Sequence, residues 1–156
     1  IPFFAHGLVY TVNGKPGDIY AVKPGGSGDV TNNRMAWHAK RKGGRDLPAP
    51  AVIGDQVLVT AMSGVTTAYD AKSGNALWSE RIEGAFSGSP LIANGLYYIQ
   101  NEAGTTYVLR PGKTLDLVAK NPLPAKPGEV FRATLVPLGD QLFIRSSNTL
   151  YCVRGS

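Results

Sequence analysis

An internal repeat constrains the fold of this chain more than any other feature. Four segments share one order of features: an apolar run, a turn with Gly, Asn or Asp, a second apolar run, a polar turn and a third run. The third run is the clearest, and its central residues are Ala21, Ala68, Val108 and Cys152. These positions are separated by 47, 40 and 44 residues. Such a period, with several strand-like runs in each unit, is typical of the blades of a β-propeller.

The other runs keep step with these four residues. Pairs such as Gly54-Asp55, Asn94-Gly95 and Gly139-Asp140 separate the first and second runs, and they tolerate the positive φ of tight hairpin turns. A fourth run follows in three units, over residues 35–40, 76–82 and 115–120. The sequence therefore predicts an all-β propeller with three four-stranded antiparallel blades and a fourth blade that lacks its outer strand.

We expect one partial propeller domain over residues 1–156, with repeats at approximately 1–47, 48–86, 87–130 and 131–156. A β-sandwich would not repeat in this register, and no window has the i, i+3, i+4, i+7 apolar spacing of an α-solenoid. The last blade of a propeller is commonly completed by a strand from the N-terminus. We therefore expect a C-terminal fragment that starts artificially at Ile1. Missing blades of the same propeller, or a second copy of the chain, would complete the ring.

The second repeat contains a denser motif over residues 68–78, which reads Ala-Tyr-Asp-Ala-Lys-Ser-Gly-Asn-Ala-Leu-Trp. Asp70 can accept hydrogen bonds from the backbone of the following turn, and Gly74 supplies the left-handed conformation that closes it. Trp78 places a large ring on the outer strand, where it can pack against the next blade. In the first and third repeats, Trp37 and Leu117 lie near the equivalent place.

This motif resembles closely the eleven-residue repeat of pyrroloquinoline quinone (PQQ) propellers, loosely A-x-D-x-x-[ST]-G-x-x-x-W. The residues that carry the resemblance are Ala68, Asp70, Gly74, Trp78 and Trp37. It implies a quinoprotein-like, BamB-like propeller, and with it a bacterial, periplasmic or secreted setting. The repeat builds blades and does not itself hold a quinone. The family's dehydrogenases have, as the resemblance implies, a vicinal cysteine pair and acidic calcium ligands.

The single cysteine rules out a vicinal pair within this chain. We therefore predict no cofactor or metal site here, and PQQ and calcium only if missing blades supply the site. Cys152 lies in an alternating apolar run and is predicted to be a small buried residue. No catalytic constellation stands out, and His6 and His38 lack the paired spacing of metal ligands. The chain does not read as an enzyme.

The formal charge of +5 suggests an acidic partner. The densest basic cluster is Lys40, Arg41, Lys42 and Arg45, in a Gly-rich connection that we take as a candidate binding loop. Arg132 and the pair Asn101-Glu102 are weaker candidates. Because aromatic residues are not interleaved with the cluster, nucleic acid is disfavoured. No apolar stretch approaches the 18 residues of a membrane span.

We therefore expect a non-catalytic scaffold propeller that binds another protein. Two alternatives stay open. The chain could be a fragment of a quinone-dependent dehydrogenase. It could also belong to an extracytoplasmic sensor or a carbohydrate-recognition propeller, in which aromatic residues such as Tyr97, Tyr98 and Tyr107 stack on a sugar.

Overall fold

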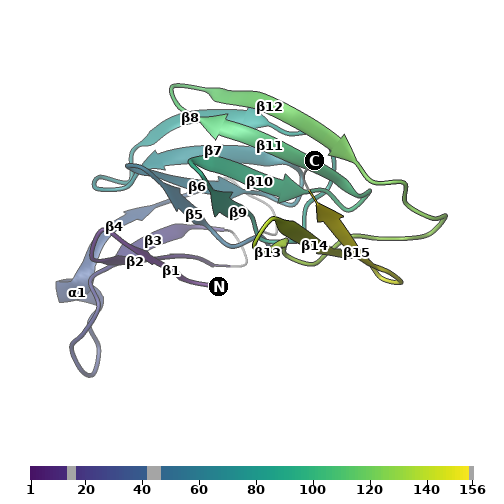
Figure 1. Ribbon diagram of the computed structural model, residues 1–156. Coiled ribbons are helices and arrows are strands. Elements are labelled where there is room, and N and C mark those ends of the chain that lie inside the picture. The colour runs from purple at the N-terminus through teal and green to yellow at the C-terminus, as the bar shows by residue number, and fades with distance from the viewer. Residues whose placement is uncertain (14–16, 42–46, 155–156) are drawn as a thin grey trace.

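A computed structural model describes residues 1–13, 17–41 and 47–154 of the chain. These residues form fifteen strands in four antiparallel sheets, three with four strands and the last with three. The sheets fan out like neighbouring blades of part of a ring (Figure 1). The predicted all-β class and partial propeller are confirmed.

Within each sheet, every strand pairs with the next one along the chain, so each sheet is a meander. The first sheet contains β1 (Phe3–Ala5), β2 (Leu8–Val12), β3 (Ile19–Val22) and β4 (Met35–Ala39), and the second β5 (Ala51–Ile53), β6 (Gln56–Thr60), β7 (Val65–Asp70) and β8 (Ala76–Arg81). The third contains β9 (Leu91–Ala93), β10 (Leu96–Gln100), β11 (Thr105–Pro111) and β12 (Leu115–Pro122), and the fourth β13 (Val136–Leu138), β14 (Gln141–Arg145) and β15 (Leu150–Arg154). The helix α1 (Thr31–Arg34) has four residues, and no helix in the described residues is long and apolar enough to cross a membrane.

The first strands of the first three blades lie at the hub, because β1 contacts β5 and β5 contacts β9. Consecutive antiparallel strands end alternately at opposite sides of a sheet, so the loops separate into two sets. We call one side the hairpin face; it carries the turns between first and second strands and between third and fourth strands. The other side, the linker face, carries the turns between second and third strands and the connections between sheets.

Two of the hub hairpins turn at His6-Gly7 and Asn94-Gly95, where both residues have positive φ. This is the pattern of a type I′ turn, whose twist matches that of the flanking strands. At Gly54-Asp55 and Gly139-Asp140 the glycine comes first and alone has positive φ, as in a type II′ turn. Four tight turns therefore close the first hairpin of every blade.

The core consists of three layers, each between two neighbouring sheets. Side chains alternate along a strand, so a strand within the stack contributes to both adjoining layers. In β6, Val57 and Val59 pack toward the first sheet while Leu58 packs toward the third. This double burial explains why the middle strands read as nearly continuous apolar runs.

Two tryptophans connect outer strands to the following blade. Trp37 of β4 donates its ring N–H to the Ala71 carbonyl at 2.9 Å, and Trp78 of β8 donates to the Gly112 carbonyl at 3.0 Å. Each ring belongs to the layer between its own sheet and the next. The motif at residues 68–78 thus has two roles. Its Trp78 donates to the turn of the next blade, and its own turn accepts the hydrogen bond from Trp37 of the blade before it.

Leu117 lies near the tryptophan position of the third repeat, but the equivalent residue is Ala119, two positions further along the chain. Ala68 pairs with Trp78 across β7 and β8, whereas the corresponding Val108 pairs with Ala119 across β11 and β12. A β-bulge follows this pair in each sheet, and the paired residues Val108 and Ala119 are 11 positions apart in sequence, whereas Ala68 and Trp78 are 10 apart. The outer strand therefore presents a methyl group where its predecessors present an indole.

The turn of the second blade is built by Asp70 and Gly74. The Asp70 carboxylate accepts hydrogen bonds from the backbone N–H of Lys72 and Ser73 and from the Ser73 hydroxyl, at 2.8–3.1 Å. These bonds lower the pKa of Asp70 below its usual value. Gly74 has φ of 74°, and a Cβ atom there would lie 2.5 Å from the Trp37 ring. The absence of a side chain at Gly74 therefore lets the Trp37 indole pack directly against the backbone of this turn.

The prediction of a buried Cys152 is wrong, because this side chain is exposed. Its counterpart Ala68 is fully buried between two sheets. Among the described residues, no further sheet packs on the far side of the last blade. For the same reason Leu138 and Leu150 are 65% exposed.

The close contact between Gly74 and the Trp37 indole leads to a prediction for Gly74→Ala. The variant should lose about 3 kcal/mol of unfolding free energy, because it adds left-handed strain and overpacking against the indole. The matched control is Gly54→Ala, where φ is 55° but a Cβ atom meets nothing within 4 Å. That variant should lose about 1 kcal/mol, for strain alone. Urea unfolding measures both losses.

A double-mutant cycle with Trp37→Ala separates the two contributions to the Gly74→Ala loss. With the indole removed, Gly74→Ala should cost no more than Gly54→Ala. Equal losses of unfolding free energy for the two glycine variants in the parent protein would show that the Trp37 ring does not pack against Gly74.

Candidate functional site

The connection between the second and third sheets is fixed to the turns on both of its sides. The N–H of Phe86 donates to the Met62 carbonyl in the turn after β6, at 2.9 Å. The N–H of Glu102, in the turn after β10, donates to the Ala85 carbonyl at 2.8 Å. Phe86 itself is fully buried between the two sheets. This connection therefore clamps two neighbouring turns of the linker face together.

The connection between the third and fourth sheets repeats the arrangement. The N–H of Phe131 donates to the Glu102 carbonyl at 3.0 Å, and that of Ser147 donates to the Val130 carbonyl at 2.8 Å. The ring of Phe131 is buried and lies against Gly104, where a Cβ atom would approach it to 2.7 Å. Because these backbone groups are satisfied by one another, the polar side chains of the linker face are not needed to pair with them.

Glu102 organises the polar surface between these two clamps. Its carboxylate accepts a hydrogen bond from the Ser87 hydroxyl and forms an ion pair with Arg132 at 3.3 Å. The hydroxyl and the guanidinium both lower the pKa of Glu102, the hydroxyl more. The Arg132 side chain remains 68% exposed. The weaker sequence candidates Arg132 and Glu102 are therefore neighbours in space, and Asn101 N–H pairs with the Thr105 carbonyl in the same turn.

A second carboxylate, Glu129, holds the fourth blade to its connection. It accepts hydrogen bonds from the Ser146 hydroxyl, from the Tyr151 hydroxyl at 2.7 Å and from the Lys126 N–H at 2.9 Å. These donors lower the pKa of Glu129 to about 2, with Ser146 the largest cause. This network is not evident from the sequence, because the partners of Glu129 lie up to 22 residues from it and belong to different elements.

Two cavities open on the linker face beside Arg132. One, of about 540 Å³, is lined by Leu47, Met62, Ser87 and Arg132. The other, of about 410 Å³, lies between the connection after β12 and the turn after β14, and Arg132 lines it as well. An exposed guanidinium thus stands at the wall of both cavities, where it can meet an acidic group from outside.

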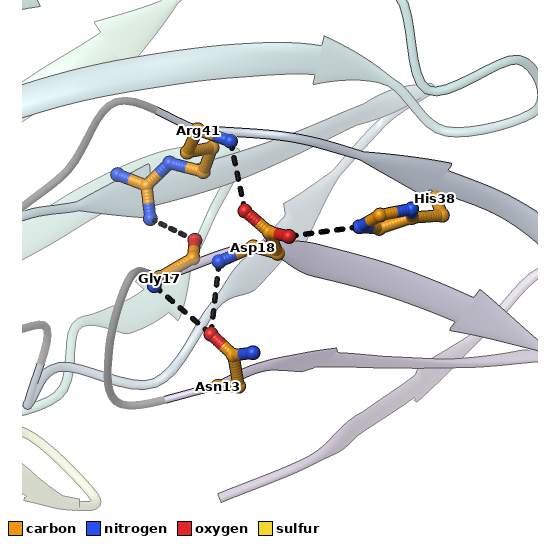
Figure 2. Close-up of polar contacts among 5 residues, drawn as sticks. All are labelled: Asn13, Gly17, Asp18, His38 and Arg41. Atoms are coloured by element: carbon orange, nitrogen blue, oxygen red, sulfur yellow. Dashed lines mark hydrogen bonds and ion pairs between the residues drawn. The ribbon is translucent and has the colours of Figure 1, made fainter.

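The predicted basic loop lies partly outside the described residues, which include Lys40 and Arg41 but not Lys42 or Arg45. Lys40 is exposed at the end of β4. The Arg41 guanidinium turns back and donates to the Gly17 carbonyl at 2.9 Å (Figure 2). Lys40 and Arg41 thus lie at the outer strand of the first blade on the linker face, and Arg41 is engaged within its own blade.

Arg41 belongs to a polar cluster around Asp18. The Asp18 carboxylate accepts from the Arg41 N–H and contacts His38 Nε2, both at 3.0 Å, while Asn13 Oδ1 accepts from the N–H of Gly17 and Asp18 (Figure 2). The Arg41 N–H and His38 lower the pKa of Asp18. These contacts fasten the turn before β3 to the end of β4, which is a structural task.

The Asp18–His38 pair has the orientation of an acid–base dyad, yet it lacks a nucleophile. The His38 ring is stacked on the Tyr20 ring, with centroids 4.6 Å apart. Within residues 1–13, 17–41 and 47–154, no Ser, Thr or Cys side chain is hydrogen-bonded to His38. In the same part of the chain, no three His, Cys, Asp or Glu side chains gather as metal ligands would.

The tyrosines considered for sugar stacking are largely used by the core. Tyr97 is fully buried, and its hydroxyl pairs with Thr60 Oγ1 at 2.7 Å. Tyr107 is 4% exposed and packs against Phe86. Tyr98 is half-buried and packs in the layer between the third and fourth sheets. Blade packing therefore accounts for all three rings.

The Glu129 network predicts acid-sensitive stability. Because the pKa of Glu129 is lowered from 4.5 to about 2 by folding, its contribution is complete above pH 4.5 and is lost as pH falls toward 2. The variant Glu129→Gln should therefore differ most from the parent protein in urea midpoint at neutral pH, and least near pH 2. Ser146→Ala, which removes the main donor, should shrink the same pH dependence. A difference that stays constant with pH would contradict this role.

The family model described as outer membrane protein assembly factor BamB matches residues 15–118. No curated protein is similar enough in sequence to count as a match. BamB from Moraxella catarrhalis superposes with a TM-score of 0.73 at 18% identity, over 95% of this chain and 43% of that one.

Two further structures share the arrangement. A quinohemoprotein alcohol dehydrogenase from Pseudomonas putida HK5 gives a TM-score of 0.66 at 20% identity, over 92% of this chain and 27% of that one. The computationally designed Ika4 protein gives 0.72 at 14% identity, over 98% of this chain and 88% of that one.

At these identities the structural likeness concerns the fold alone, and the chain spans less than half the length of the two natural proteins. The match of the family model covers about two thirds of the chain and contains the complete motif at residues 68–78. On this evidence the chain belongs to the family of the outer membrane protein assembly factor BamB.

Proposed function

We propose that the protein is a non-catalytic scaffold that binds another protein through its linker face. The observation that supports this best is the position of Arg132, which is 68% exposed and lines two cavities between clamped turns. A fixed backbone with exposed side chains reduces the ordering cost of binding. The hairpin face offers tight two-residue turns between first and second strands, which present less side-chain surface.

The proposal includes a cell compartment and a partner class. The family is described as an outer membrane assembly factor, which favours a bacterial, periplasmic or otherwise secreted setting. Protein partners rather than nucleic acid fit the scattered cations of the linker face. Osmotic-shock fractionation of the native host, with the protein followed by antibody, tests the compartment.

Site-specific photo-crosslinking tests the binding face. A benzophenone side chain at Met62, in the wall of a linker-face cavity, should give one defined protein adduct in the native host. The same group at Asn94, in a hairpin-face turn, serves as the control and should give none. Adducts that form from Asn94 alone, or equally from both positions, would overturn the proposal.

The dehydrogenase alternative is favoured by the alcohol dehydrogenase among the structural neighbours. The test adds calcium and PQQ to the protein together with an alcohol and a redox dye. We expect no quinone absorbance that stays with the protein through gel filtration and no dye reduction. Stoichiometric retention of the quinone would favour the enzyme instead of the scaffold.

A further inference from the structure

The cavity between the third and fourth blades brings together two arginines from different blades. Arg132 comes from the connection after β12 and Arg145 from the end of β14, and both line a space of about 410 Å³. Ser147 and Val130 complete the wall between them. Since the N–H of Ser147 donates to the Val130 carbonyl, the two sides are fixed relative to each other.

The donors of this cavity are largely unused. An arginine carries five N–H donors. Arg132 has one ion pair, to Glu102 at 3.3 Å, and the Arg145 guanidinium has no hydrogen bond or ion pair to the described residues. The Ser147 hydroxyl accepts from the Val130 N–H at 3.3 Å, and its own proton has no acceptor there. The cavity therefore presents more donors than the described residues satisfy.

Two nearby carboxylates do not neutralise the arginines fully. Glu129 is 6% exposed, and Ser146, Tyr151 and Lys126 occupy its oxygens. One carboxylate oxygen of Glu102 accepts from the Ser87 hydroxyl and the other accepts from Arg132. Neither carboxylate forms an ion pair with Arg145. A planar anion that enters from solvent can thus meet guanidinium groups that keep free donors.

The shape and lining of the cavity favour a peptide carboxylate over nucleic acid. A volume of about 410 Å³ accepts a few side chains, not a duplex. Among the described residues that line the cavity there is no aromatic ring on which a base could stack, as in single-strand binding sites. Within the proposed protein-binding function, on which this step rests, we propose that Arg132 and Arg145 bind a Glu or Asp carboxylate from an acidic segment of the partner protein.

Fluorescence anisotropy with a defined peptide tests this proposal. The probe is a labelled, end-capped hexapeptide with two adjacent glutamates, and the reference peptide has glutamines instead. Arg145→Gln and Arg132→Gln should each weaken binding of the glutamate peptide about tenfold, because a charge-assisted hydrogen bond is lost. The glutamine peptide should bind the parent protein at least about tenfold more weakly.

The matched control is Arg110→Gln. Arg110 is also exposed, and its guanidinium has no hydrogen bond or ion pair to the described residues, but it lies at the hairpin-face end of β11. This variant removes the same charge and should bind the glutamate peptide like the parent protein. Urea midpoints within error of the parent would show that all three variants are folded.

Several outcomes would overturn the proposal. Equal weakening by Arg110→Gln would reduce the effect to net charge, and equal affinity for both peptides would exclude carboxylate recognition. Tighter binding of a single-stranded oligonucleotide, sensitive to Arg145→Gln, would assign the cavity to nucleic acid. A protein adduct from Met62 without glutamate-peptide binding would leave the scaffold function standing and reject this cavity as its site.

Discussion

Every blade in the middle of this chain has apolar side chains on both faces, and this double burial is the constraint on which the structure depends. A sheet such as β5–β8 cannot be stable with either face in water, because Val57 and Leu58 point to opposite sides and both are fully buried. Stacking of sheets in sequence satisfies both faces at once. The core is therefore divided into three layers instead of one central cluster.

The layers are closed by two different devices, one on each side of the blades. Near the hairpin face, Trp37 and Trp78 reach the turn of the next blade. Ala119 ends this series at the third outer strand. The junction of the third and fourth blades instead relies on the linker face, where Phe131 fills the layer and Glu129 binds the following turn. The weaker packing on one side is offset by a polar network on the other.

The sequence was sufficient to predict the strands and their grouping, because each blade repeats a period of two along its strands and Gly or Asn at its turns. It failed at Leu117, because this residue pairs with Leu109, whereas the partner of Val108 across the hairpin is Ala119. It also failed at Cys152, whose burial depends on a neighbouring sheet and not on the local pattern. Arg132 was identified as a weak candidate, whereas Arg145 reads as an ordinary polar position in strand β14 and becomes notable only through its neighbours in space.

Loop length separates the first hairpin of each blade from the connections between blades. Between β1 and β2 or between β9 and β10, two residues must reverse the chain, so backbone φ decides which residues are allowed. The connections after β8 and β12 instead cross from the rim of one blade to the hub of the next, and their backbone is fixed by the turns they clamp. The exposed side chains of these connections can then change without loss of the blade. Because Arg132 occupies such a position, binding specificity can be altered there while the packing of Phe131 beside it stays intact.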